Sequence, residues 1–229
     1  MALAGNALVA IWNDIAPEMR EDFFEWHPRE HMVERLGIPG FLRGRRYAAV
    51  QADVEFLTLY EVAGPQVLVS DLYRQRLNNP TPWSSRTLPG FRNNVRGACR
   101  IHFTAGAAMG GFVYTLRLEA EEGREEALVD ALQRQVMPRL CDQPRITAAH
   151  FVENDVSLTG GNAGNQRGRM IELPHLVVLI EGSTADGVRT AAARFLAPEA
   201  LRPLGARPGM SGGLYQLEYS IQNLASGPR

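Results

Sequence analysis

Two histidines four residues apart form the first pattern in this sequence with a known chemistry. Residues 27–31 are His-Pro-Arg-Glu-His, the spacing at which two histidines on one helix face bind zinc while the glutamate acts as a base. Pro28 argues against such a site, because a proline removes a backbone donor and kinks the helix that must aim both imidazoles. A third protein ligand is also needed, and as far as Leu118 only His102 is suitable. We therefore predict no metal site.

Amide side chains precede a large aromatic side chain in residues 78–83, Asn-Asn-Pro-Thr-Pro-Trp. Two prolines spaced in this way prevent a continuous helix, so an irregular segment is expected at 78–82. A rigid segment with amides and an indole is suited to orienting a small ring-containing ligand, which makes Asn79 and Trp83 candidate substrate-binding residues. The alternative is a surface connection that is held in place by the packing of Trp83.

Arginine is distributed unevenly along the chain. Residues 72–118 contain seven arginines and no acidic residue, whereas the expected first helix is rich in Asp and Glu. These helix carboxylates pair with the arginines at the surface in one interpretation, and each such pair then contributes little to stability. In the other, one or two arginines face a cavity and bind a carboxylate or phosphate bidentately. Arg86 and Arg92 are the candidates for this role, because they lie in an irregular segment.

Composition excludes several classes of function. All 24 basic residues are arginine, so Schiff-base chemistry, a P-loop lysine and a kinase lysine are excluded. A net charge of −1 argues against nucleic acid as a partner. No window of 18 uncharged apolar residues is present, so no membrane association is expected. Cys99 and Cys141 have no CxxC partner and the N-terminus lacks a basic leader, which predicts a cytoplasmic protein with reduced thiols.

The elements that must position these residues follow the same order in both halves of the chain. Periodicity predicts, in the first half, strand 7–13, a helix from 14 to about 36, strands 41–50 and 55–62, a helix over about 65–77 and strand 95–103. It predicts, in the second half, strand 112–119, helix 123–140, strands 146–158 and 175–181, helix 186–196 and strand 213–221. Each half is thus expected to form a ferredoxin-like βαββαβ unit. The expected domains are residues 1–105 and 106–229, joined by the small uncharged residues 104–111.

An α+β fold with two such units makes a barrel possible within one chain. A four-stranded sheet with both helices on one face needs cover on its other face, so the two antiparallel sheets are expected to pack together. This order, with Trp26–His31 and the later Ile38-Pro39-Gly40-Phe41 and Arg46-Tyr47, resembles the dimeric α+β barrel superfamily in its tandem form. The EthD-like and antibiotic-biosynthesis-monooxygenase-like branches are the most similar. The motifs cover roughly residues 7–103.

The resemblance implies roles for four residues of the first half. His31 corresponds to the histidine that ends the first helix of EthD-like sequences near their cavity, where a histidine serves as general base or acid. Its alternative role is to donate to a backbone carbonyl. Asn13 corresponds to the pocket asparagine of heme-degrading relatives, or else caps the following turn. His27 lies on the same arc of the helix as His31, and Trp26 lies on the adjoining arc; both are candidate substrate-binding residues.

These observations together predict a cofactor-free enzyme that acts on a small cyclic or aromatic acidic metabolite by proton transfer or oxygenation. Twelve of the 18 aromatic residues precede position 106, so the pocket is expected in the first half. One alternative is a non-catalytic small-molecule-binding or structural protein of the same fold. A further alternative is a heme-binding protein, although residues 65–101 lack the histidine that heme-degrading relatives place there. A small molecule is the expected ligand, and a monomer and a homodimer are both compatible.

Overall fold

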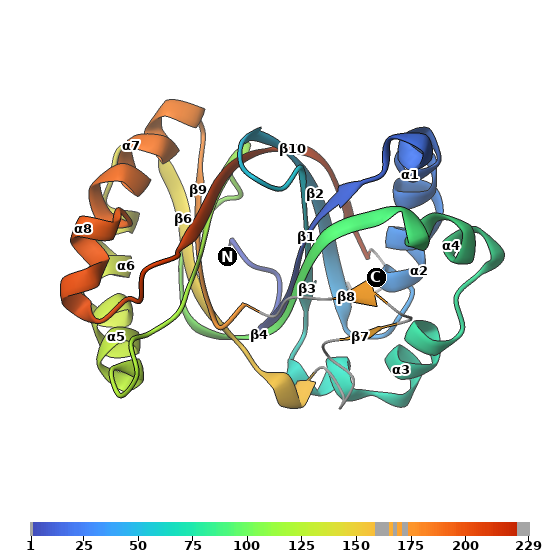
Figure 1. Cartoon of the computed structure of the whole chain (residues 1–229), viewed down its shortest axis with the longest axis horizontal. Coiled ribbons are helices and arrows are strands. Elements are labelled where there is room, and N and C mark those ends of the chain that lie inside the picture. Colours follow the sequence, from blue (N-terminus) through green and yellow to red (C-terminus); the bar gives the residue numbers. More distant parts are fainter. Residues whose placement is uncertain (1, 159–164, 167–168, 171–173, 224–229) are drawn as a thin grey trace.

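Eight antiparallel strands close into a barrel at the centre of the molecule (Figure 1). The computed structural model describes residues 2–158, 165–166, 169–170 and 174–223. The barrel strands are β1 (Ala7–Ile15), β2 (Phe41–Gln51), β3 (Phe56–Val62), β4 (Phe91–Gly106), β5 (Phe112–Leu118), β6 (Ile146–Asn154), β9 (Leu176–Gly182) and β10 (Ser211–Gln222). A separate two-stranded sheet pairs β7 (Asn165–Gln166) with β8 (Arg169–Met170). The predicted strand 146–158 ends at Asn154, and Val156–Leu158 forms a 3₁₀ helix instead. Most of the Gly- and Asn-rich loop expected at 159–169, namely residues 159–164 and 167–168, lies outside the described residues.

Each half of the chain contributes four neighbouring strands in the same spatial order. The first half forms β4-β1-β3-β2 and the second forms β10-β5-β9-β6, so that in each half the fourth strand lies beside the first. Two antiparallel seams join the halves, β2 with β10 and β4 with β6. The predicted α+β class, with ferredoxin-like units that close an intrachain barrel, is therefore confirmed. The domain boundary at residue 105 stays a prediction.

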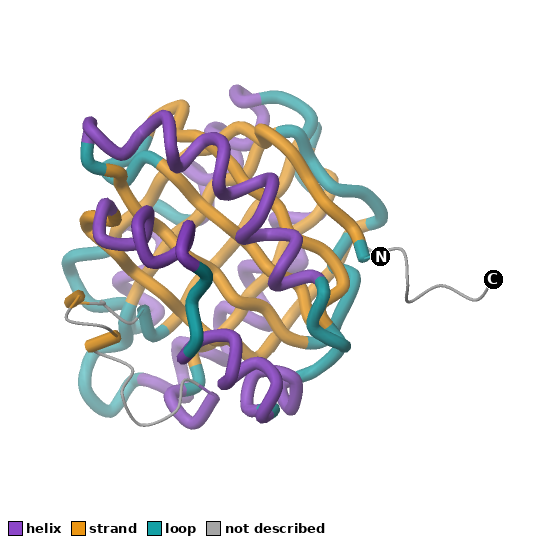
Figure 2. The backbone as a smooth tube through the Cα atoms, turned by 90° about the vertical axis from the view of Figure 1, so that its right-hand side faces the viewer, coloured by secondary structure: helices purple, strands orange, loops and turns teal. Residues whose placement is uncertain are grey.

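Helices cover the barrel on two opposite sides (Figure 1), and Figure 2 looks onto one of these sides, where helices lie in front of the strands. The first half contributes α1 (Arg20–Trp26), α2 (Met32–Leu36), α3 (Asp71–Asn78) and α4 (Pro82–Thr87), and the second contributes α5 (Glu125–Ala131), α6 (Met137–Cys141), α7 (Ala185–Phe195) and α8 (Pro198–Leu201). Apolar side chains between these helices and the outer faces of the strands form separate cores in the two halves. Within the part of the chain that the structure describes, no helix is long and apolar enough to cross a membrane.

Pro28 is accommodated without breaking the first helix. Residues His27–His31 form a π-helical turn between α1 and α2, and all three segments follow one another without a gap. A π turn inserts one extra residue and locally replaces the regular pattern of backbone hydrogen bonds. The N–H that proline lacks is therefore tolerated there, whereas a regular helix would lose a backbone hydrogen bond. The helix in the second half has the same device at Leu132–Val136, just before Pro138. Such turns are frequent at functional sites.

The second helical region of the first half differs from the single helix expected at 65–77. Pro65–Val69 forms a 3₁₀ helix, and Ser70 then caps α3 by accepting a hydrogen bond from the Tyr73 N–H. Asn79–Thr81 lies outside helices, but α4 begins at Pro82, because Thr81 caps it through the Ser84 N–H. Proline is favourable at the first position of a helix, so the second proline starts a short helix that was not predicted.

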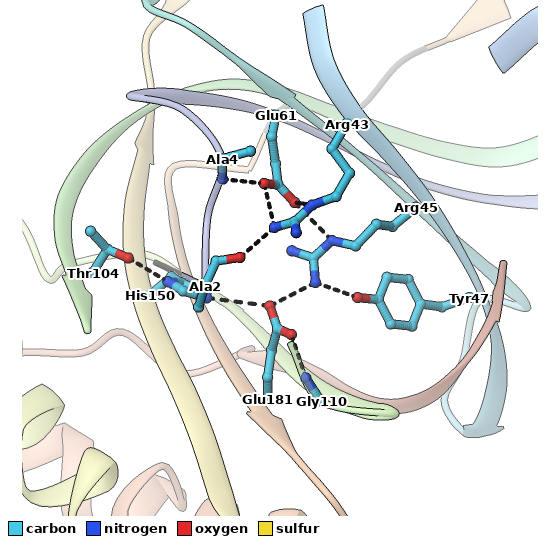
Figure 3. A network of polar contacts seen from close by, with 10 residues as sticks. All are labelled: Ala2, Ala4, Arg43, Arg45, Tyr47, Glu61, Thr104, Gly110, His150 and Glu181. Carbon is cyan, nitrogen blue, oxygen red and sulfur yellow. Dashed lines mark hydrogen bonds and ion pairs between the residues drawn. The ribbon is translucent and has the colours of Figure 1, made fainter. Parts of the chain in front are cut away.

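The barrel interior combines an apolar cluster with a buried ionic network. Alternation along β2, β3 and β9 points every second residue inward, and Arg43 and Arg45 meet Glu61 and Glu181 there (Figure 3). The Arg45 guanidinium lies 2.8 Å from a carboxylate oxygen of Glu181 and 2.8 Å from one of Glu61. Glu61 also accepts a hydrogen bond from the backbone N–H of Ala4. Glu181 also accepts one from the backbone N–H of Gly110, and its carboxylate contacts the ring of His150.

Candidate functional site

A small cavity of about 80 Å³ lies between the helices of the first half and the outer face of its sheet. Its polar lining includes two histidines, two arginines, two tyrosines and two asparagines. The lining residues are Val9, Ile11, Asn13, His27, His31, Arg35, Phe41, Thr58, Tyr60, Tyr73, Leu77, Leu88, Phe91, Asn94 and Arg96. We take this cavity as the candidate active site, because it collects titratable groups in a concave, mainly apolar space.

Strand and helix periodicity explain why these side chains meet. Alternate residues of a strand share a face, so the outer face of β1 presents Val9, Ile11 and Asn13 while Leu8, Ala10 and Trp12 fill the barrel. The outward residues of β3 and β4 that line the cavity follow the same alternation: they are Thr58, Tyr60, Asn94 and Arg96. From the helix above, His27, His31 and Arg35 reach the cavity at intervals of four residues, which places them on one side of a helix.

His31 is half-buried and its ring lies against the indole of Trp26. The ring centroids are 4.3 Å apart, with an angle of 31° between the ring planes. The Trp26 indole N–H lies 3.2 Å from both the Glu30 carboxylate and the Ser84 hydroxyl. Trp26 itself is not part of the cavity lining. Its role at the site is to orient the His31 ring by packing against it.

His27 is buried at the floor of the cavity and is held by the other half of the chain. Its Nδ1 lies 2.6 Å from the hydroxyl of Tyr219 on β10. Burial lowers the pKa of His27 well below its ordinary value, and the charge of Arg46 lowers it further. His27 is therefore a neutral imidazole at physiological pH, with one nitrogen engaged by Tyr219.

The depressed pKa of His27 makes stability depend on pH. The unfolded chain protonates this imidazole near pH 6.5 and the folded chain does so only at lower pH. The stabilisation is thus complete above about pH 6.5 and is lost as pH falls toward the folded pKa, by up to about 1.4 kcal/mol for each pH unit. Urea unfolding at pH 7.5 and pH 5.0 measures this slope. His27→Gln is expected to have the shallower slope, and an unchanged slope in this variant would contradict the neutral assignment.

Asn13 lies at the cavity near the end of β1 and is almost fully buried. Its side-chain N–H₂ donates to the backbone carbonyl of Asp14 at 3.3 Å. It does not cap the Pro17–Met19 turn, for which the described residues show no side-chain cap. The amide oxygen is thus available to orient a ligand.

The other predicted site residues lie apart from the cavity lining. Trp83 and Arg86 both contact Asp22. Arg86 therefore follows the first of the two interpretations, in which arginines pair with helix carboxylates at the surface. Asn79 is exposed and donates to the Gln75 carbonyl at the end of α3. Arg92 is exposed and donates to the backbone carbonyls of the residue before it and of Pro89. None of these four is brought to the candidate site.

Two arginines that the sequence analysis did not select line the cavity instead. Arg35 follows His31 by one helical turn, and Arg96 lies on β4 next to the inward-facing Val95. Adjacent residues of a strand point to opposite faces. An inward-facing Val95 would therefore have predicted that Arg96 points outward, to the face that the helices cover. For Arg35, the spacing from His27 and His31 was the corresponding signal.

Solved structures share the fold over nearly the whole chain. An anthrone oxidase-like protein is 14% identical, with 98% of this chain and 96% of that one covered and a TM-score of 0.66. A proposed monooxygenase from Fusobacterium nucleatum is 7% identical over 96% of both chains, with a TM-score of 0.59. A heme-binding protein from Thermus thermophilus is 10% identical, over 92% and 91%, with a TM-score of 0.50. No protein-family model and no curated protein matches the sequence. The structural matches establish the fold and leave the activity open.

Proposed function

We propose that this chain, which has the fold of the dimeric α+β barrel superfamily, is an enzyme that acts on a small acidic cyclic or aromatic metabolite without a cofactor. The observation that carries the proposal is the convergence of His31, His27 and Asn13 on one cavity with apolar walls. His31 is the proposed general base or acid, because it is half-exposed and oriented by Trp26. His27 and Asn13 bind and orient the substrate.

Proton removal from the substrate is the step common to both proposed reaction types. Once His31 has taken the proton, the carbanion is reprotonated at another carbon in an isomerisation. In an oxygenation, the carbanion is oxidised by dioxygen and forms a C–O bond to it, and the resulting hydroperoxide loses water to leave a carbonyl. Two structural neighbours, named as anthrone oxidase-like and as a proposed monooxygenase, favour oxygenation. His31 returns its proton to the new carbon position in the isomerisation and to the peroxide in the oxygenation.

The size of the cavity limits the ligand. Its volume of about 80 Å³ is roughly half that of an engineered cavity of about 150 Å³ that binds benzene. A ring therefore enters only if lining side chains move, and the half-buried Leu77, Leu88 and Phe91 are the apolar ones that border the surface. A heme does not fit these residues, since ligands of that size occupy cavities of roughly 300–1,000 Å³.

An exchange experiment separates the two reaction types from mere binding. The protein is incubated in D₂O with hydroxyaromatic carboxylic acids and with β-keto acids, and NMR follows deuterium incorporation while an electrode follows dioxygen. Proton transfer predicts exchange without oxygen consumption, and oxygenation predicts both. Ligand binding with neither signal would support the non-catalytic alternative and would contradict the proposed activity. A Soret shift on addition of heme would contradict the argument from cavity size.

A further inference from the structure

We propose that Arg35 and Arg96 bind the carboxylate of a small, otherwise apolar acid in the candidate active site. The inference rests on the proposed function because it concerns the same cavity. It does not require that the cavity be catalytic. It reassigns the anion-binding role from Arg86 and Arg92, which lie outside the cavity lining, to two arginines that are both buried with 7% exposure.

The two guanidinium groups are held together by one aromatic side chain. Arg96 donates from Nη2 to the hydroxyl of Tyr73 at 2.8 Å. The guanidinium carbon of Arg35 lies 6.0 Å from the centre of the same ring. Tyr73 thus places two positive charges at one end of the cavity.

Within the part of the chain that the structure describes, these two arginines differ from the other buried arginines in having no acidic partner. Arg43, Arg45 and Arg46 each form an ion pair with a glutamate. Among the described residues, no ion pair includes Arg35 or Arg96, and no lining residue is Asp or Glu. Glu34, the residue next to Arg35, instead faces Arg76 at 3.7 Å. Buried charge without compensation is costly, so its presence points to a ligand of opposite charge.

Further polar atoms at the cavity are also unsatisfied. Arg35 Nη1, the Tyr60 hydroxyl and Asn94 Oδ1 are buried and have no hydrogen-bond partner within the described part of the chain. Burial raises the pKa of Tyr60, so its hydroxyl keeps its proton and acts as a donor. A carboxylate accepts from both guanidinium groups and from this hydroxyl. The apolar walls formed by Val9, Ile11 and Phe41 suit the remainder of such an acid better than the additional oxygens of a phosphate.

Binding of matched charged and neutral probes tests this inference by calorimetry. The probes are propionate and benzoate, their neutral amides propionamide and benzamide, and inorganic phosphate. At least one carboxylate is expected to bind, its amide is expected to bind at least tenfold more weakly, and phosphate more weakly than the carboxylate. Arg35→Gln and Arg96→Gln are each expected to weaken carboxylate binding at least tenfold, which is the loss of one charged hydrogen bond. The exposed Arg86→Gln and Arg92→Gln are matched controls and should leave binding unchanged.

Melting temperatures without ligand distinguish a binding role from a structural one. Removing an uncompensated buried charge should leave the melting temperature unchanged or raise it. Arg35→Lys and Arg96→Lys retain the charge and are expected to fold while binding carboxylates more weakly. Equal binding of acid and amide, tighter binding of phosphate, or equal losses in the Arg86→Gln control would overturn the inference. Because no turnover is required, carboxylate binding can succeed where the exchange experiment fails. Turnover of a neutral substrate would contradict this inference and the acidic substrate class, but not the catalytic role of the cavity.

Discussion

Replacing Glu181 by glutamine is expected to lower the free energy of unfolding by about 3–5 kcal/mol. Glu181 is fully buried in the barrel, where its carboxylate lies 2.8 Å from Arg45 and accepts from the Gly110 N–H at 2.9 Å. A neutral amide retains the shape of the side chain and removes the charge that compensates Arg45. The remaining Glu61 must then serve both Arg43 and Arg45, which leaves one buried positive charge in excess.

Urea unfolding of wild type and variant at pH 7 measures this effect, with Glu119→Gln as the matched control. Glu119 pairs with Arg207 at the surface, where losing an ion pair changes stability by about 1 kcal/mol at most. A loss below about 1 kcal/mol for Glu181→Gln as well would contradict the account of the network.

The same carboxylate predicts how the wild type responds to acid. Burial alone would raise the pKa of Glu181, but Arg45, followed by His150, lowers it to about 2. Its stabilisation is therefore present above the unfolded pKa of 4.5 and is lost as pH falls toward 2. Glu181→Gln is expected to lose this part of the acid dependence.

Replacing His31 by glutamine is expected to lower turnover by roughly 10²–10⁴-fold, the contribution of a general base or acid. Glutamine retains hydrogen-bonding capacity but takes up no proton near neutral pH. Because His31 is half-exposed and glutamine can occupy the space beside Trp26, the melting temperature should change little. Steady-state kinetics with any substrate found by the exchange experiment provides the measurement.

His102→Gln is the control for this variant. His102 is a half-exposed histidine on β4 that is paired with Glu153, away from the cavity lining. Its replacement should leave turnover unchanged. Turnover within threefold of wild type in His31→Gln would remove His31 from the mechanism and would favour its structural alternative, a hydrogen bond to a backbone carbonyl.

Local sequence patterns predict much of this fold because they depend on neighbouring residues. The apolar run at residues 7–13 and the helix-breaking residues 37–40 before strand 41–50 are local signals, so these strands and their order could be predicted. The barrel could be predicted because two sheets with one bare face each must be covered. The π turn at His27–His31 could not be predicted, since a proline at position 28 is compatible with a kink, a break or a bulge in the helix.

The candidate site was only partly predictable, because it depends on contacts between distant residues. His27, His31 and Asn13 were selected for their chemistry, and the fold brings them together. Arg86 and Arg92 were selected because an irregular segment was expected there, but the structure places them in α4 and near the start of β4, where both are exposed and contact a carboxylate and backbone carbonyls. The contact between His27 and Tyr219 spans 192 positions. No local pattern indicates a partner at that separation.

Native mass spectrometry of protein purified without added ligand tests the central claim most directly, namely that this cavity holds a small acidic molecule. The account predicts that wild type retains a small carboxylic acid that is released on denaturation. It also predicts that the folded double variant Arg35→Gln/Arg96→Gln does not retain it, whereas Arg86→Gln/Arg92→Gln does. Retention of the same mass by the Arg35→Gln/Arg96→Gln variant, or retention of a neutral molecule or a heme by wild type, would contradict the account.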